Sequence, residues 1–309
     1  MMNRLWLFGC IGLTLLPLGA CSAPNPSPPD AAQTQRAEQP TLTVGAIPDQ
    51  DPEKLQRLYE KVAAYLQKEL QVPVVYKPVT DYAAAVTAFK VGDLDLVWFG
   101  GLTGTQARLQ VPGATAIAQR DIDAQFHSVF IANPASGLTP FTTAQDLTKL
   151  KGKTFTFGSE SSTSGRLMPQ YFLQQVGVTL ADFKGKPGFS KSHDATLELV
   201  QAGSYEAGVM NEQVWQSRVE DGSVDPAKVT VIWRSPAYHD YHWVLNPSVG
   251  DRFGVGFPAK VQAALLKLDP NNPEHQAILD LFKARKFIPT DAANYRQIEQ
   301  VGREIGKIK

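Results

Sequence analysis

One stretch of the sequence gathers hydroxyl side chains where a helix is expected to begin. It reads Gly158-Ser-Glu-Ser-Ser-Thr-Ser-Gly165-Arg166-Leu-Met-Pro169 and lies between a strand pattern and a helix pattern. Ser161, Ser162, Thr163 and Ser164 bring their hydroxyls to the backbone N–H groups that a helix start leaves free. The helix dipole and these donors favour an anion. One hydroxyl is enough for an N-cap, so four in a row predict a bound tetrahedral oxyanion, with a ligand-free cap as the alternative.

Three more motifs accompany the hydroxyl-rich stretch. They are Val97-Trp98-Phe99-Gly100, Ser190-Lys-Ser-His193-Asp194-Ala195 and Pro236-Ala-Tyr238-His-Asp-Tyr241. With Ser162-Thr163-Ser164-Gly165 they resemble the phosphonate, phosphite and phosphate family of ABC-transporter binding proteins, in the family's order and from about Thr41 to the C-terminal helices. The resemblance implies an α/β fold of the type II periplasmic binding protein kind, in which two lobes close over an anion in the cleft between them.

The resemblance also implies which residues hold the ligand. They lie on both sides of the cleft: Ser162, Thr163 and Ser164 on the anion's oxygens, Tyr82 and Trp98 or Phe99 on the opposite lobe, and His193 as a donor beside the cleft. Two alternatives stay open. His193 can be a helix-cap residue next to Asp194, and Trp98 can pack in the core at the end of a buried strand.

One position departs from the family's pattern. Where the family often has an Asp after a strand of the second lobe, the chain reads Val209-Met210-Asn211-Glu212. A carboxylate only accepts hydrogen bonds and suits a ligand that carries a proton or an amine, whereas the amide of Asn211 also donates. We therefore count Asn211 among the ligand-binding residues and expect a fully deprotonated oxyanion. This expectation fails if Glu212, rather than Asn211, faces the cleft.

Three short segments resemble one branch of the family, which is named for selenate transport. They are Ile47-Pro48-Asp49, Thr80-Asp81-Tyr82-Ala83-Ala84 and Phe99-Gly100-Gly101-Leu102-Thr103-Gly104. Selenate and sulfate carry no proton near neutral pH, which agrees with the argument from Asn211. The ligand class is therefore a small tetrahedral oxyanion, either of the phosphonate and phosphite kind or selenate.

The N-terminus carries the pattern of an export signal. Arg4 precedes the apolar run Leu5–Leu18, and a small-residue cleavage site follows, so residues 1–20 are predicted to be a signal peptide. The apolar run is shorter than the about 20 residues that span a bilayer comfortably. The sequence Leu18-Gly19-Ala20-Cys21 resembles the bacterial lipobox, which predicts lipidation at Cys21.

The segment after Cys21 is predicted to tether a folded domain to a bacterial membrane, on its periplasmic or extracytoplasmic side. Residues 21–40 are mostly Pro, Ala, Gln, Ser and Asn without a large apolar side chain, so they cannot bury enough surface to fold. Cys10 lies in the removed leader, and the folded part has no cysteine for a disulfide. An ordinary secreted protein with a cysteine after its cleavage site is the alternative.

Two series of alternating strands and helices follow the tether. Their order, β-α-β-α-β, suggests a parallel sheet. The first series has strands at 41–47, 72–76 and 94–99 and helices at 51–70 and 81–90. The second has strands at 128–132, 154–158, 186–189, 207–210 and 229–234 and helices from 143, at 164–176 and at 193–201. Helices dominate the tail. We expect residues 41–127 with 237–309 to form lobe 1 and residues 128–236 to form lobe 2, with the ligand cleft between them.

The charge balance indicates a small-molecule partner. Lys plus Arg equals Asp plus Glu at 30 each, so no basic field points to a nucleic acid. We expect no cofactor and no metal. The family resemblance adds the membrane subunits of an ABC transporter as partners, and a tethered capture protein needs no second copy, so we expect a monomer.

Three other functions were weighed. A hydrolase using Ser164 and His193 is disfavoured because neighbouring helix residues such as His193 and Asp194 do not face each other, and no Gly-x-Ser-x-Gly elbow is present. A metal site at His239 and His242 lacks a clear third ligand. A sensor that reports the bound ligand to a membrane kinase has the same binding physics as an importer, so the sequence does not separate the two.

Overall fold

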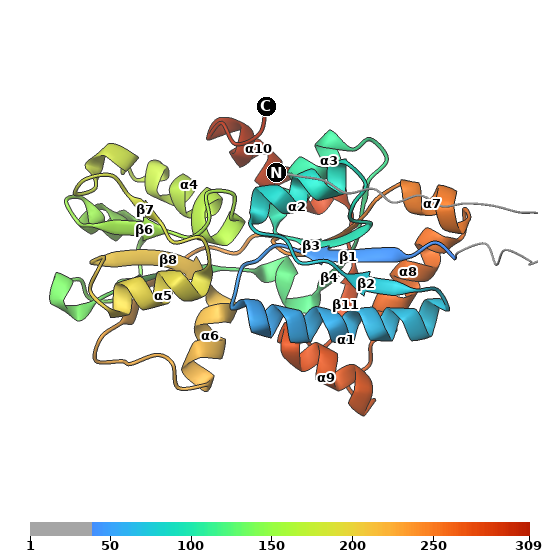
Figure 1. Cartoon of the computed structure of the whole chain (residues 1–309). Helices are drawn as coiled ribbons and strands as arrows, with labels where there is room; N and C mark the ends of the chain where they lie inside the picture. Colours follow the sequence, from blue (N-terminus) through green and yellow to red (C-terminus); the bar gives the residue numbers. More distant parts are fainter. Residues whose placement is uncertain (1–38) are drawn as a thin grey trace, which may run out of the picture. The chain divides into compact units, whose positions relative to one another are not determined.

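The computed structural model describes residues 39–309, which form one compact unit. The predicted signal peptide, the lipidation site Cys21 and the tether as far as residue 38 lie outside the described residues. Within the described part of the chain, no helix is both long and apolar enough to cross a membrane. Two β-sheets flanked by helices organise the unit (Figure 1).

The first sheet has six strands in the order β11-β4-β10-β3-β1-β2. Its strands are β1 (Leu42–Ala46), β2 (Val74–Tyr76), β3 (Leu96–Phe99), β4 (Thr115–Arg120), β10 (His242–Leu245) and β11 (Phe287–Pro289). Strands β1, β2 and β3 run parallel, as the sequence predicts, whereas β10 and β11 are antiparallel to the strands beside them. The C-terminal part of the chain thus completes the first sheet.

Seven helices belong to the first sheet or follow it. They are α1 (Pro52–Leu70), α2 (Tyr82–Lys90), α3 (Gly101–Gln110), α7 (Ser248–Phe253), α8 (Phe257–Leu266), α9 (Pro273–Phe282) and α10 (Arg296–Glu304). The longest, α1, begins at Asp51, whose side chain accepts the Lys54 N–H over 2.9 Å. Its buried stripe, which includes Leu55, Val62 and Leu66, packs on β1 and β2. Each fully buried Leu contributes about 1.5–3 kcal/mol.

The second sheet has five strands in the order β7-β6-β8-β5-β9. Its strands are β5 (Ser128–Ala132), β6 (Phe155–Phe157), β7 (Gly188–Phe189), β8 (Ala207–Asn211) and β9 (Thr230–Arg234). Helices α4 (Met168–Gln175), α5 (His193–Gln201) and α6 (Glu212–Glu220) accompany it. All residues of β5 and β8 are buried because α5 and α6 pack on these two strands. We call the elements around the first and second sheets the first and second lobes.

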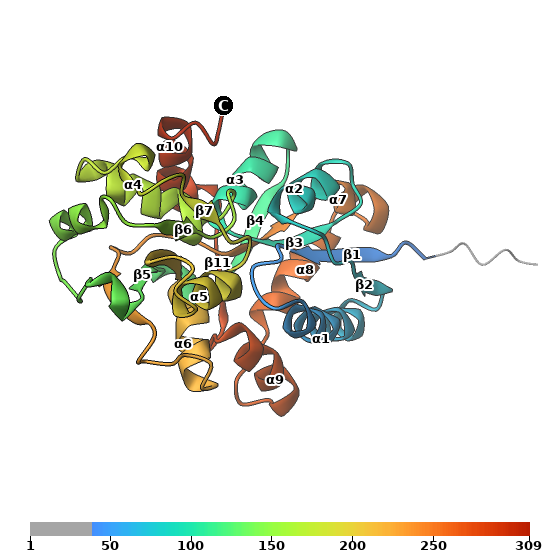
Figure 2. The same ribbon diagram turned by 60° about the vertical axis from the view of Figure 1, so that its left-hand side comes forward.

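Two short segments carry the chain between the sheets. The first crossing segment, residues 121–127, leaves β4 for β5, and the second, residues 235–241, leaves β9 for β10. They pair with each other, because the Phe126 N–H donates to the Tyr238 carbonyl over 2.9 Å and the Tyr238 N–H donates back over 3.0 Å. Helix α10 also contacts both lobes, packing on α3 and on α4, as Figure 2 shows near the C-terminus.

The predicted and observed elements agree best where a strong pattern meets a cap. Helix α5 spans His193–Gln201 as predicted, with Ser192 accepting the Ala195 N–H. The helix predicted at 164–176 instead opens with a π-helical turn, Thr163–Leu167, before α4. The helix predicted from 143 is 3₁₀ at Ala144–Leu150. The two-lobe boundaries at 127 and 236 stay a prediction.

Candidate functional site

The hydroxyl-rich stretch follows β6 of the second sheet and contains the π-helical turn. The Ser162 hydroxyl oxygen accepts the Gly165 N–H over 2.9 Å, so this serine is the N-cap. Gly165 is needed here, since a Cβ would lie 3.1 Å from the His193 ring and 3.2 Å from the Gly158 Cα. The first N–H groups of such a turn have no intrahelical carbonyl. The turn therefore presents backbone donors beside a Ser164 hydroxyl that is buried and without a partner.

Thr163 joins this turn to the first lobe. Its hydroxyl oxygen accepts the Leu102 N–H over 2.9 Å at the start of α3. The preceding N–H, that of Gly101, donates to the Asp240 carboxylate over 2.8 Å. Gly100 lies between the two acceptors, because a Cβ on it would be 3.2 Å from Thr163 Oγ1 and 3.3 Å from Asp240 Oδ1. The two helix starts thus face each other across the interface between the lobes.

Three buried polar atoms around this interface have no hydrogen-bond partner within the described chain: Tyr82 Oη, Ser164 Oγ and Asp240 Oδ2. Tyr82 lies beside Ser162, and Asp240 lies beside Thr163. All three atoms therefore surround the same three-residue turn. A buried polar group without a partner costs about 1–3 kcal/mol, so a polar ligand at this place would satisfy groups that the fold leaves unsatisfied.

Asp240 has an unusual acidity for a carboxyl group. Burial raises its pKa from 3.8 to about 7, although the hydrogen bond from the Gly101 N–H opposes the shift. A carboxyl group with such a pKa is partly protonated at neutral pH. The protonated form can donate a hydrogen bond as well as accept one.

His193 is held as a neutral donor. It is fully buried at the start of α5, and burial lowers its pKa to about 4. The Asn211 N–H donates to Nδ1 over 3.3 Å, which makes Nδ1 the unprotonated nitrogen and leaves the hydrogen on Nε2. Nε2 lies 3.4 Å from the Tyr241 hydroxyl. The ring therefore donates its one N–H to the Tyr241 hydroxyl, and a role for His193 as a ligand donor stays a prediction.

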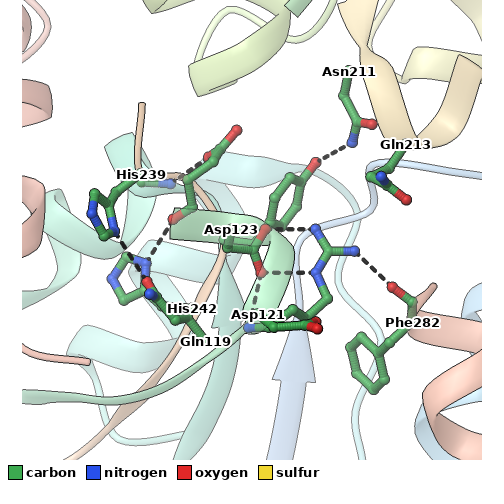
Figure 3. Close-up of polar contacts among 12 residues, drawn as sticks. Gln119, Asp121, Asp123, Asn211, Gln213, His239, His242 and Phe282 are labelled. Carbon is green, nitrogen blue, oxygen red and sulfur yellow. Dashed lines mark hydrogen bonds and ion pairs between the residues drawn. The ribbon is translucent and has the colours of Figure 1, made fainter. Parts of the chain in front are cut away.

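Asn211 caps α6 and also contacts the second crossing segment. Its side-chain oxygen accepts the Val214 N–H over 2.7 Å, and its amide nitrogen donates to the Tyr241 hydroxyl over 3.1 Å (Figure 3). Glu212 pairs with Arg234. A buried carboxyl group beside the turn is present at Asp240. The role of Asn211 in binding a fully deprotonated ligand stays a prediction.

The two aromatic residues of β3 point to opposite faces of the sheet. Trp98 stacks on Tyr241 with the ring centroids 5.8 Å apart, and the Arg120 guanidinium lies 5.4 Å from its ring. Phe99 packs edge-on against Phe89. Trp98 thus lies behind the tyrosine of the crossing segment, whereas Phe99 belongs to the core of the first lobe.

Arg120 anchors the two crossing segments. It forms a two-bond pair with Asp123 and donates to the Phe282 carbonyl over 2.9 Å (Figure 3). Its guanidinium also lies 5.1 Å from the Tyr241 ring. Because Asp123 and the Phe282 carbonyl occupy its donors, Arg120 orients the segment that carries Asp240 and Tyr241.

His239, in the second crossing segment, and His242, in β10, make separate contacts. His239 contacts the Gln119 side chain, and His242 is buried and stacks on Tyr295 with the ring centroids 3.8 Å apart. Among residues 39–309, no group of three His, Cys, Asp or Glu side chains could hold a metal ion.

The sequence reasoning assigned no role to Asp240 or Tyr241 individually. The signal was present in Pro236-Ala-Tyr238-His-Asp-Tyr241, which was recognised only as a motif. Arg166, in the same turn as Ser164, is buried, with its guanidinium 4.3 Å from the Phe157 ring.

Comparison with known proteins places this geometry in one family. Residues 44–295 match the model of the ABC transporter, phosphonate, periplasmic substrate-binding protein family. The chain is 48% identical over 269 residues to the probable ABC transporter phosphite binding protein PhnD1 of Prochlorococcus marinus (strain MIT 9301), covering 87% of this chain and 91% of that protein. It is 26% identical to the phosphonates-binding periplasmic protein of Escherichia coli (strain K12), covering 68% and 61% of the two chains.

Solved structures agree in fold. The structure of Prochlorococcus marinus PhnD1 in complex with methylphosphonate has a TM-score of 0.85 and 48% identity, covering 87% of this chain and 99% of that one. The aliphatic sulphonate binding protein SsuA of Escherichia coli, at 14% identity and a TM-score of 0.57 over 87% and 93% of the chains, shares the fold alone. These relatives are binding proteins, and this chain is a binding protein rather than an enzyme. It belongs to the family of periplasmic substrate-binding proteins of phosphonate ABC transporters.

Proposed function

We propose that this chain captures phosphite or a small phosphonate and delivers it to the membrane subunits of an ABC importer. The observation that carries the proposal is the set of three unpartnered buried atoms, Tyr82 Oη, Ser164 Oγ and Asp240 Oδ2, around the turn at residues 162–164. The 48% identity to a phosphite-binding protein whose structure contains methylphosphonate supports the same ligand class.

The donors of the site suit an oxyanion bound without a salt bridge. Tyr82 and Ser164 are neutral donors, and the N–H groups at the start of the π turn add the positive end of a helix. In a buried site these preoriented dipoles act at low dielectric. They therefore hold a negative charge without a cation in contact.

Asp240 favours a ligand that retains a proton. Phosphite and phosphonates exchange one proton near neutral pH, so the ligand and Asp240 can share a hydrogen between two oxygens. Sulfate and selenate have no such proton, and an ionised Asp240 would repel them. Selenate remains a competing ligand only while Asp240 itself is protonated.

Isothermal titration of residues 39–309 against phosphite, methylphosphonate, phosphate, sulfate and selenate at pH 6 and pH 8 tests this ligand class. We expect the tightest binding for phosphite or methylphosphonate. Tight binding of selenate or sulfate alone would overturn the proposed ligand, and absence of saturable binding to all five would overturn the function.

A matched pair of variants assigns the binding to the turn. Ser164→Ala removes a buried hydroxyl without a protein partner, and a hydrogen bond to a charged ligand is worth about 1.5–3 kcal/mol, so affinity should fall about 10- to 100-fold. Ser161→Ala, in the same stretch but half-buried, should bind as the unmodified chain does. Equal effects of the two substitutions would remove the turn from the site.

We also propose that the mature protein is a monomer anchored by lipid at Cys21. The leader, the lipobox-like sequence and the Pro-rich segment after it support the anchor. The full chain expressed in a bacterium should enter the membrane fraction and incorporate labelled fatty acid, and Cys21→Ser should abolish both. Incorporation of labelled fatty acid into the Cys21→Ser protein would exclude Cys21 as the attachment site. Light scattering of residues 39–309 should give the mass of one chain.

An importer and a sensor make different predictions for the cell. Deleting the gene should abolish growth on phosphite or methylphosphonate as the sole phosphorus source if the protein serves import. Unchanged uptake with a lost transcriptional response to the ligand would favour the sensor.

A further inference from the structure

Asp49 lies in the loop between β1 and α1 and is buried, with 3% of its surface exposed. Its carboxylate accepts the Tyr241 hydroxyl over 2.8 Å, and its backbone carbonyl accepts the His193 N–H over 3.0 Å. One partner thus lies on the crossing segment and the other at the start of α5 in the second lobe. The side chain and the backbone carbonyl of Asp49 therefore both contact elements outside the first sheet and its helices.

Tyr241 extends the contact to a third element. A tyrosine hydroxyl has one hydrogen, and Asp49 takes it, so the oxygen can only accept from other groups. The Asn211 amide donates to that oxygen over 3.1 Å. Asp49 is therefore connected through Tyr241 to the cap of α6 as well as directly to α5. Because its hydrogen is engaged, Tyr241 is not free to donate to an anion.

The residues after Asp49 strengthen the same junction. The Asp51 N–H donates to the Asp194 carboxylate over 2.7 Å, and Arg218 donates to the other oxygen of Asp194 over 2.7 Å. Lys54 reaches Ser217 on α6 over 3.2 Å. The loop before α1 is thus attached to both helices of the second lobe that face it.

The burial of Asp49 makes the stability of this junction depend on whether the lobes stay together. A buried carboxylate is expensive unless hydrogen bonds compensate it, and burial raises the pKa of Asp49 to about 6 despite the Tyr241 hydrogen bond. Separation of the lobes would return the carboxylate to water and recover its hydration. The hydrogen bond therefore compensates the buried carboxylate only while the lobes stay together, and a ligand that favours the closed state keeps this contact formed.

We propose that Asp49 is a closure latch: a positioning residue that holds the two lobes together over the bound anion through Tyr241 and α5, and thereby sets how slowly the ligand leaves. The inference rests on the proposed function. In this proposal Asp49 determines how fast the lobes open, and the turn at residues 162–164 contacts the ligand.

Stopped-flow measurement of ligand binding separates these roles. With phosphite or methylphosphonate as the probe, Asp49→Ala should raise the dissociation rate constant about 10- to 100-fold, the effect of losing a hydrogen bond to a charged group, and change the association rate constant less than about threefold. The matched control is Asp51→Asn, which keeps the cap of α1 and its backbone contact to Asp194. It should dissociate as the unmodified chain does.

A second readout excludes a general loss of stability. Removal of a closure latch should leave the melting temperature of the ligand-free protein within about 2 °C and reduce the rise in melting temperature that saturating ligand produces. An equal fall in the melting temperatures of the ligand-free and ligand-bound proteins would make Asp49 a structural residue and overturn the proposal. Unchanged dissociation in Asp49→Ala would do the same.

A double-mutant cycle tests the route through Tyr241. If the carboxylate acts through the tyrosine hydroxyl, the effects of Asp49→Ala and Tyr241→Phe on the dissociation rate should overlap rather than multiply. If the effects of the two substitutions on the dissociation rate multiply fully, Asp49 does not act through Tyr241. Failure of the unmodified chain to bind any of the oxyanions would instead refute the proposed function and is distinguishable from failure of the latch.

Discussion

The Thr163 hydroxyl accepts the backbone N–H of Leu102 over 2.9 Å and thereby links the start of α3 in the first lobe to the π turn in the second. Both residues are buried. This hydrogen bond fixes a side chain of the turn by a group of the opposite lobe, so the position of the Thr163 side chain depends on how the two lobes meet.

Replacing Thr163 by valine keeps its shape and removes the acceptor. The Leu102 N–H would then be buried without a partner at a cost of about 1–3 kcal/mol, so we expect the affinity for phosphite to fall about 10- to 100-fold in isothermal titration. Thr163→Ser retains the hydroxyl and should lose less than about fivefold. Similar losses in both variants would show that the methyl group, not the hydroxyl, matters.

Gly100 should not tolerate a side chain. A Cβ would enter the narrow space between Thr163 Oγ1 and Asp240 Oδ1 and push the two lobes apart at the site. We expect Gly100→Ala to weaken ligand binding at least tenfold while the circular dichroism spectrum is unchanged. Gly256→Ala is the control, since no atom lies within 4 Å of its added Cβ and its φ is −80°. Normal binding by Gly100→Ala would contradict the tight contact.

The raised pKa of Asp240 predicts a pH dependence of folding stability. Its pKa is about 7 in the folded chain and 3.8 ordinarily, so between these values the folded state retains a proton that the unfolded state has lost. The free energy of unfolding then decreases as pH rises from about 4 to about 7 and levels off above. We expect the stability of the unmodified chain relative to Asp240→Asn, measured by urea unfolding, to follow this course. A difference independent of pH would show that Asp240 has an ordinary pKa.

Removing one partner of the buried pair formed by Arg120 and Asp123 should strongly destabilise the fold. Both side chains are buried, so Asp123→Ala leaves an uncompensated guanidinium and should lower the free energy of unfolding by about 3–5 kcal/mol. The pair of Lys149 and Asp146 is solvent-exposed, and Asp146→Ala should change stability little. Urea unfolding compares the two, and equal effects would contradict the difference in burial.

The sequence predicted the parts of the fold whose information is local. The apolar spacing of α1, the cap of α5 at Ser192 and the buried run of β5 each lie within one short window, and all three elements were predicted at or near their observed bounds. The π turn was predicted as a helix because its first hydroxyl is a good N-cap. In the fold, Gly165 of this turn lies close to the His193 ring and to Gly158, contacts that the sequence pattern does not show.

The site was predictable only where one segment supplies it. Ser162, Thr163 and Ser164 are adjacent in sequence, and their pattern indicated an anion without reference to any other element. The partners of Asp49 on other elements, His193 and Tyr241, lie 144 and 192 residues away along the chain, and nothing local shows that its carboxylate meets Tyr241. The sequence pattern also could not show that Asp240 carries a buried carboxyl oxygen without a partner, because that property depends on contacts with distant elements.

The second crossing segment combines two kinds of group, because Asp240 has a buried carboxyl oxygen without a partner while Tyr238 and Tyr241 contact the segments that connect the lobes. Within the turn at residues 162–164, Thr163 also bonds to the other lobe, whereas the Ser164 hydroxyl has no such bond. A substitution at Ser164 therefore changes the polar lining of the turn while the contacts between the lobes are kept. Substitutions at Thr163 or at residues 238–241 alter the lining and the motion together, so a new ligand preference is more easily evolved at Ser164 than along the crossing segment.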